Sequence, residues 1–144
     1  LKKGSEIFQI WFDPNLHESL YEEANYSDHK SETFTFQNKD GVKTKIISDT
    51  NNQLDLKSKS IQIYQHFFSK GMYNHKIYNN RFHSIFIQSG KIKIDNVIYD
   101  AGDFLVVEDE ANLIFEIDTN TKIFEIISLI KLPYTTYAEM HNIN

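Results

Sequence analysis

Cysteine is absent from all 144 residues of this chain. Its absence excludes disulfides, thiolate metal sites and cysteine nucleophiles, and we expect a cytoplasmic protein. Glycine and proline are also scarce, with five and two residues, and the glycines stand apart from one another. No glycine-rich loop that cradles phosphate is present.

The sequence also lacks a cluster of basic residues of the kind that binds the phosphates of nucleic acid. Arg81 is the single arginine, the 14 lysines are scattered, and the net charge is −5. We therefore expect no nucleic acid and no membrane surface as partner. Since no apolar run reaches about 18 residues and no signal peptide opens the chain, the sequence predicts a soluble protein. Because the chain starts at Leu1 rather than Met, we expect it to be part of something longer.

What the sequence does have is apolar and aromatic side chains in short alternating runs. Apolar residues make up 40% of the chain and aromatic residues 14%, which suits one packed domain. Turn signals at Asn38 to Gly41 and at Asp95-Asn96 separate runs spaced by roughly 8–12 residues, as in sandwiches and barrels. The predicted strands are residues 5–12, 33–36, 42–48, 61–68, 83–88, 91–94, 96–99, 103–107, 112–117 and 122–130. Short helical turns are expected after Asp13 or Asn15 and at 135–140, and the fold class is an all-β jelly roll.

A jelly-roll barrel of the cupin type holds a metal with a His-x-His pair, a Glu a few residues later and a third His from a later strand. None of the six histidines forms a His-x-His pair. If Gly90 ends the first motif, the Glu position falls on His83 and the His positions fall near Ile77 and Asn79. The third His position is occupied by Leu105. The spacing therefore predicts no metal site, although convergence of His66, His75 and His83 by another geometry stays open.

Other catalytic patterns are also missing. Glu108 to Glu110 is best explained as a solvated turn between two strands, and Glu22-Glu23 as a similar polar segment, for which a role at a site entrance is the alternative. No Ser–His–acid order stands out, and the hydroxyl residues lack the context of a nucleophile elbow. The sequence therefore predicts no catalytic residue in this chain.

Several stretches together resemble one family. FQIWFDP (8–14), YEE (21–23), IQIYQHFF (61–68), HSIFIQSGKIKIDNVIYDAGD (83–103), ANLIFEID (111–118) and KIFEIISL (122–129) resemble, in this order, the pirin family. Pirins are bicupins, with two cupin barrels in one chain. The likeness is greatest to the bacterial branch with quercetin 2,3-dioxygenase activity, and it covers nearly the whole chain.

The resemblance implies an organisation. Residues 1–30 would be the last strand of a preceding barrel plus a linker, and residues 31–144 a C-terminal cupin barrel with a short tail. In that family the metal, iron or another divalent transition metal, lies in the N-terminal barrel, so no cofactor is expected in this chain. The partners implied are that N-terminal barrel and a second copy of this chain. The apolar segment from Ile7 to Phe12 would pair as an edge strand either with its own domain or with the same segment of that second copy.

The expected role is therefore support of the metal-bearing barrel of a quercetin-type dioxygenase, without catalysis by this chain alone. Two alternatives remain: a protein-interaction module, and a barrel that binds a small ligand. The candidate ligand pocket combines polar and apolar side chains, namely Tyr64, His66, His83, Ile85, Ile87, Leu105 and Val107.

Overall fold

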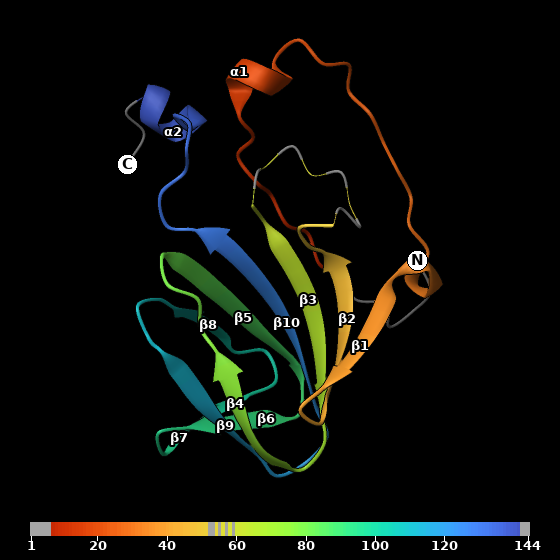
Figure 1. Ribbon diagram of the computed structural model, residues 1–144, viewed down its shortest axis with the longest axis vertical. Coiled ribbons are helices and arrows are strands. Elements are labelled where there is room, and N and C mark those ends of the chain that lie inside the picture. The colour runs from red at the N-terminus through yellow and green to blue at the C-terminus, as the bar shows by residue number, and fades with distance from the viewer. Residues whose placement is uncertain (1–6, 52–53, 55, 57, 59, 142–144) are drawn as a thin grey trace.

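The computed structural model describes residues 7–51, 54, 56, 58 and 60–141. Within these residues, ten strands form two antiparallel sheets that face each other (Figure 1). The strands are β1 (Thr35–Lys39), β2 (Val42–Ser48), β3 (Gln62–Phe68), β4 (Gly71–Lys76), β5 (Arg81–Ser89), β6 (Lys91–Ile94), β7 (Val97–Asp100), β8 (Phe104–Val107), β9 (Asn112–Ile117) and β10 (Thr121–Leu129).

The larger sheet has the order β1-β2-β3-β10-β5-β8, and the smaller sheet has the order β4-β9-β6-β7. The last strand, β10, lies between β3 and β5 in the centre of the larger sheet. Consecutive strands repeatedly cross from one sheet to the other, which is the arrangement of a jelly roll. The predicted fold class is confirmed.

Two tight hairpins use residues that tolerate left-handed backbone. Asp95 and Asn96 join β6 to β7 with φ of 47° and 68°, and Asp40 and Gly41 join β1 to β2 with φ of 51° and 78°. Positive φ at both central positions matches the right-handed twist of the flanking strands. Both turns lie where the sequence predicts them.

The core forms between the two sheets because the strands alternate. Along β10 the residues Ile123, Glu125 and Ile127 point inward and are buried, while the residues between them are only half-buried. Phe115 of β9 packs into the same layer from the smaller sheet. The period of two therefore places one face of each strand in the core, and it places one carboxylate there as well.

Short helices flank the barrel. Helix α1 (Leu16–Ser19) begins after Asn15, whose side chain accepts a hydrogen bond from the His17 N–H, and α2 (Tyr137–Met140) begins with a capping box. A 3-10 turn, η1 (Ser31–Thr33), precedes β1. The expected helical turns are present, although α1 is shorter than the segment reaching Tyr21.

Residues 7–12 do not form the predicted strand, and the first two residues of that prediction, Ser5 and Glu6, lie outside the described part of the chain. Instead, the Phe8 ring packs on Phe86 of β5 and Phe124 of β10, with ring centroids 4.9 and 5.0 Å apart. Asp13 then accepts a hydrogen bond at its carbonyl from the Tyr134 hydroxyl. Side-chain packing on its own domain replaces the expected strand pairing.

Strand β4 was not predicted. Its sequence GMYNHK lacks β-branched residues and contains Gly, Asn and Lys, which are depleted in strands. It forms because it lies at the edge of the smaller sheet and pairs with β9 along six residues, from Gly71 opposite Ile117 to Lys76 opposite Asn112. Tertiary pairing overrides local propensity here, and His75 lies on this strand.

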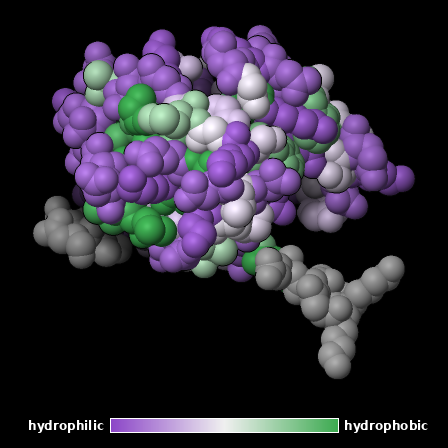
Figure 2. Space-filling view, turned by 90° about the horizontal axis from the view of Figure 1, so that it is seen from below, coloured by the Kyte–Doolittle hydropathy of each residue, from purple (hydrophilic) through white to green (hydrophobic). Residues whose placement is uncertain are grey.

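Hydrophilic side chains dominate the face shown in Figure 2, and apolar side chains appear there in small groups. Among the described residues, no helix has both the length and the apolar character needed to cross a membrane.

Gly90 provides a test of the fold. It joins β5 to β6 with φ of 79°, and a Cβ there would lie 2.7 Å from the Asn120 carbonyl oxygen and 2.8 Å from the Thr121 Cα. We expect Gly90→Ala to lower the free energy of unfolding by roughly 1–3 kcal/mol more than Gly102→Ala. Gly102 is the matched control, since its φ is 99° but a Cβ would meet nothing within 4 Å. If urea unfolding showed the same decrease in the free energy of unfolding for both variants, the close approach of Gly90 to Asn120 and Thr121 would be unimportant for stability.

Candidate functional site

Glu125 lies in the middle of β10 with its carboxylate in the space between the sheets, and the residue is only 1% exposed. It is opposite Tyr64 on β3 and Ile85 on β5. Burying an ionised carboxylate costs several kcal/mol unless hydrogen bonds satisfy it. Its partners are therefore the first question about this site.

Two of the partners follow from the strand register. His66 on β3 is opposite Ile123, and His83 on β5 is opposite Ile127, so the two histidines are the diagonal neighbours of Glu125 on the same face. His66 Nε2 lies 2.8 Å from Glu125 Oε2, and His83 Nδ1 lies 2.8 Å from Glu125 Oε1. The central strand thus carries a carboxylate held from both sides.

The third partner, His75, reaches across from the smaller sheet. Its Nε2 lies 2.8 Å from Glu125 Oε1, the same oxygen that contacts His83. The His75 ring stacks on Phe115 with centroids 4.6 Å apart and an interplanar angle of 13°. The carboxylate therefore links the two sheets through polar contacts at the centre of the barrel.

These contacts keep Glu125 ionised. Burial acts to raise its pKa, but the charge interaction with His75 and the hydrogen bonds from His66, His75 and His83 outweigh burial and hold the pKa well below its ordinary value. An ionised carboxylate only accepts hydrogen bonds. All three facing nitrogens therefore carry hydrogens and donate to it.

The second ring nitrogens distinguish the three histidines. His83 Nε2 accepts from the Tyr78 backbone N–H at 2.9 Å, so the proton of neutral His83 is fixed on Nδ1. His66 Nδ1 lies 2.8 Å from the Thr44 hydroxyl, which can act as donor or acceptor. His75 Nδ1 has no hydrogen-bond partner among the described residues. Of the three imidazoles, therefore, only that of His75 has a second ring nitrogen without a hydrogen bond to the described residues.

A cavity of about 320 Å³ opens beside this cluster, between β2, β3, β4 and β10. His66, His75 and Glu125 line it together with Tyr64 and Thr44. Burial, followed by the charge of Asp49, raises the pKa of Tyr64 to about 12, so its hydroxyl stays neutral and donates to Gln62 Oε1 at 3.2 Å. The cavity wall thus offers both donors and acceptors.

A metal is the group that a cupin fold first suggests, and the donor types here are suitable. His75, His83 and Glu125 each offer a ligand atom, and these atoms lie within 4.8 Å of one another. Coordination through His83 Nδ1, however, needs the lone pair that the fixed proton occupies. Moving that proton to Nε2 would point it at the Tyr78 N–H, leaving two donors face to face. The three residues therefore do not fit a metal in this hydrogen-bond arrangement.

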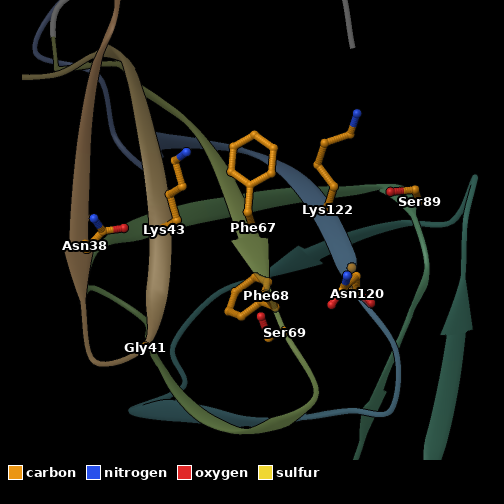
Figure 3. A pocket seen from close by; sticks show the side chains of 10 residues that line it. Asn38, Gly41, Lys43, Phe67, Phe68, Ser69, Ser89, Asn120 and Lys122 are labelled. Atoms are coloured by element: carbon orange, nitrogen blue, oxygen red, sulfur yellow. The ribbon is translucent and has the colours of Figure 1, made fainter.

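A larger hollow of about 490 Å³ lies elsewhere on the barrel, where Lys43, Phe67 and Lys122 project side by side from β2, β3 and β10 (Figure 3). Phe67 is directly opposite both lysines in the sheet register. Among the described residues, none that lines this hollow carries a carboxylate or an imidazole. The smaller cavity, with its buried charge, is therefore the better candidate for chemistry.

The predicted pocket residues lie in three places. Tyr64 and His66 line the cavity, and His83 lies behind it on Glu125. Ile85 and Ile87 are fully buried in the apolar core, and Leu105 and Val107 pack against that core. Tyr64 and His66 therefore lie together at the cavity, whereas the four apolar residues of the predicted pocket lie in the core or against it.

Sequence reasoning missed Glu125 as a site residue and did not select His75. The sequence contained a sign of Glu125, because it places a charge between the inward-facing apolar residues Ile123 and Ile127. His75 had none beyond its residue type, since β4 was not predicted. The convergence of His66, His75 and His83, which the sequence left open, is present in the structure.

The charge on Glu125 can be tested through pH. Because folding lowers its pKa, the unfolded chain binds more protons below the ordinary value of 4.5, so the stabilisation is present above that pH and is lost as pH falls toward the folded pKa. We expect Glu125→Gln to reduce the free energy of unfolding by roughly 2–4 kcal/mol at neutral pH, since three donors lose their anion. Urea unfolding across the acid range should show a shallower pH dependence for this variant.

Glu116→Gln is the control for that experiment. Glu116 forms a half-exposed ion pair with Lys93 at 2.9 Å, and such pairs contribute about 0–1 kcal/mol. Parallel pH curves for Glu125→Gln and the wild-type chain would mean that Glu125 is not the titrating group.

No protein-family model and no curated protein sequence matches this chain. Solved structures do match it. A quercetin 2,3-dioxygenase from Acinetobacter baumannii has a TM-score of 0.59 at 8% identity, over 78% of this chain and 45% of that one. Ectoine synthase from P. lautus has a TM-score of 0.58 at 10% identity, over 81% and 85%. An RmlC-like cupin from Shewanella frigidimarina has a TM-score of 0.52 at 18% identity, over 72% and 92%. At these identities the likeness concerns the fold, and the chain has the cupin fold.

Proposed function

We propose that this chain is a cupin domain that binds a small polar molecule in the cavity beside Glu125. The observation that carries the proposal is the buried, ionised carboxylate with three imidazole donors at the wall of an open cavity. Apolar residues of similar volume usually stabilise a core as well as or better than buried charges do. A buried charge cluster in a cavity is therefore a good sign of a binding or reaction site.

The lining suggests a neutral ligand. Lys39 and Lys76 contribute two positive charges to the cavity wall, and Asp40, Asp49 and Glu125 contribute three negative ones. The nearly balanced charges do not favour a strongly anionic or cationic molecule. The volume of about 320 Å³ lies at the lower end of small-molecule sites, which span about 300–1,000 Å³.

We propose further that this chain carries no transition metal of its own, as the motif spacing predicts. The support is the tautomer of His83, which the Tyr78 N–H holds in the form without a lone pair at Nδ1. The cytoplasmic location stays a prediction from the sequence.

Blocking the cavity tests the binding proposal. Ile46 lines it from β2 with an uncharged side chain, and Lys43 lies on the same strand beside the other hollow. We expect neutral polar fragments that bind the wild-type chain in ligand-observed NMR to be lost in Ile46→Trp and retained in Lys43→Trp. Fragments that bind the wild-type chain and both variants equally would refute the cavity as the site.

The metal-free proposal is tested separately by elemental analysis. One equivalent of metal in the purified chain, lost in His75→Gln, would refute it.

A second candidate function has one observation in its favour. The Acinetobacter quercetin 2,3-dioxygenase matches most of this chain, yet this chain accounts for 45% of its length. We propose as the alternative that this domain supports a second cupin barrel, as in the pirin-like proteins that it resembles. Quercetin-type oxygen chemistry, with iron or another divalent transition metal, would then belong to that other barrel. A His-x-His motif in the coding sequence upstream of Leu1 would support this candidate.

The segment from Ile7 to Phe12 is where such a partner, or a second copy of this chain, would bind. Ile7 and Trp11 are 68% and 84% exposed although both are large and apolar. We expect the isolated chain to self-associate through them, because the exposed apolar area is unfavourable in water. Sedimentation equilibrium should show weaker association for Trp11→Ser than for the control Met72→Ser, which removes an apolar side chain, 72% exposed, from β4. A wild-type monomer at all concentrations would contradict the expected dimer.

A further inference from the structure

The larger hollow, which lies away from the cluster on Glu125, has a charge pattern of its own. We propose that it binds a flat aromatic ring with an anionic group at each end, the ring stacked on Phe67 and the anionic groups at Lys43 and Lys122. This second site is independent of the proposed binding function. Among the described residues, the hollow and the cavity beside Glu125 share only Phe68 in their linings.

The hollow is built on one continuous row across the larger sheet. In the strand register each member of this row is opposite the next, namely Asn38 of β1, Lys43 of β2, Phe67 of β3, Lys122 of β10 and Ser89 of β5. Residues that are directly opposite each other project from the same face of a sheet. Because Phe68 points into the core, the row containing Phe67 is on the outer face, and all five of its members line the hollow.

The two lysines flank the Phe67 ring at a spacing that the sheet sets. Because neighbouring strands lie about 4.7–4.9 Å apart, the backbones of Lys43 and Lys122 are roughly 9–10 Å apart, with Phe67 between them. Figure 3 shows the Phe67 ring between the two lysine side chains. The Phe36 ring orients Lys43 further, since its centroid lies 4.4 Å from Lys43 Nζ. A ring stacked on Phe67 therefore has one cation beyond each of its two ends.

The charges of the hollow favour an anionic ligand. The whole chain carries a net charge of −5, yet the described residues that line the hollow include two lysines and no carboxylate. Neither of these ammonium groups forms an ion pair with a carboxylate of the described residues. The cavity beside Glu125 has the opposite balance, with three acidic residues against two lysines. Electrostatic attraction therefore directs an anion to the hollow rather than to the cavity.

The rest of the lining suits a small aromatic molecule. Phe67 is half-buried and offers a ring face for stacking. The amides of Asn38 and Asn120 and the hydroxyl of Ser89 are hydrogen-bond donors for anionic oxygens at either end. The volume of about 490 Å³ lies within the range of small-molecule sites. Two lysines are too few for a nucleic acid strand, whose affinity depends on many phosphate contacts.

Terephthalate, a benzene ring with a carboxylate at each end, is the probe for this site. In heteronuclear NMR titrations we expect it to shift the backbone amide signals of Lys43, Phe67 and Lys122. Lys43→Gln and Lys122→Gln should each raise its Kd by about three- to tenfold, since each variant removes one charge-assisted contact. Lys91→Gln is the matched control and should leave the Kd unchanged, because Lys91 is an exposed lysine on β6 outside the hollow. Unshifted signals at the row, or the same Kd in all three variants, would overturn the site.

Two relatives of terephthalate separate the role of the ring from that of the charges. The saturated trans-cyclohexane analogue keeps both carboxylates but has no aromatic face, and benzoate keeps the ring with one carboxylate. We expect each to bind the wild-type chain about threefold or more weakly than terephthalate, because stacking or one ion contact is lost. Phe67→Leu should remove the preference for terephthalate over the saturated analogue. Equal affinities of the three compounds, or a preference that survives Phe67→Leu, would overturn the ligand class.

Competition distinguishes this site from the cavity beside Glu125. A chain saturated with terephthalate should still bind the neutral polar fragments, and Lys43→Trp should lose terephthalate while it retains them. Displacement of the fragments by terephthalate would place both ligands in one site and overturn the second site. A chain that binds terephthalate through Lys43 and Lys122 but binds no neutral fragment would refute the cavity proposal alone.

Discussion

The buried charge of Glu125 is the constraint on which the centre of this barrel depends. An ionised carboxylate between two apolar sheets must find donors, and here β3, β5 and β4 supply one imidazole each at 2.8 Å. Two of these come from the larger sheet and one from the smaller, so the carboxylate links the two sheets. Satisfying a buried ion in this way is what makes its burial tolerable.

The three imidazoles that contact Glu125 differ in the partner of their second ring nitrogen. A backbone N–H stands behind His83, a hydroxyl behind His66 and no described group behind His75. A backbone amide N–H can only donate, so it sets the tautomer of His83, whereas the hydroxyl beside His66 can donate or accept. No described group sets the role of His75 Nδ1. The same difference argues against coordination of a metal by His83.

Much of the fold could be predicted from the sequence because it rests on local patterns. Alternating apolar residues predicted nine of the segments in which strands lie, and the Asp95-Asn96 and Asp40-Gly41 turns predicted two hairpins. Strand β4 could not be predicted, since its residues favour a strand only when β9 is beside it. Residues 7–12 failed in the opposite sense, because a strand-like composition there is used for side-chain packing of Phe8. Both errors arise where a long-range contact decides the structure.

The site was harder to predict for the same reason. His66 and His83 are diagonal neighbours of Glu125 only once β10 is known to lie between β3 and β5, and those strands are far apart in sequence. Counting residues from a metal motif finds ligands at fixed spacing, whereas this cluster takes its members from four different strands. Yet the inward position of Glu125 between Ile123 and Ile127 was visible in the alternation of β10 alone. A charge in the middle of an inward-facing apolar series requires buried partners, and the imidazole N–H groups of histidines are suitable donors. The physical cost of that single carboxylate is therefore a better guide to the site than the spacing of the histidines.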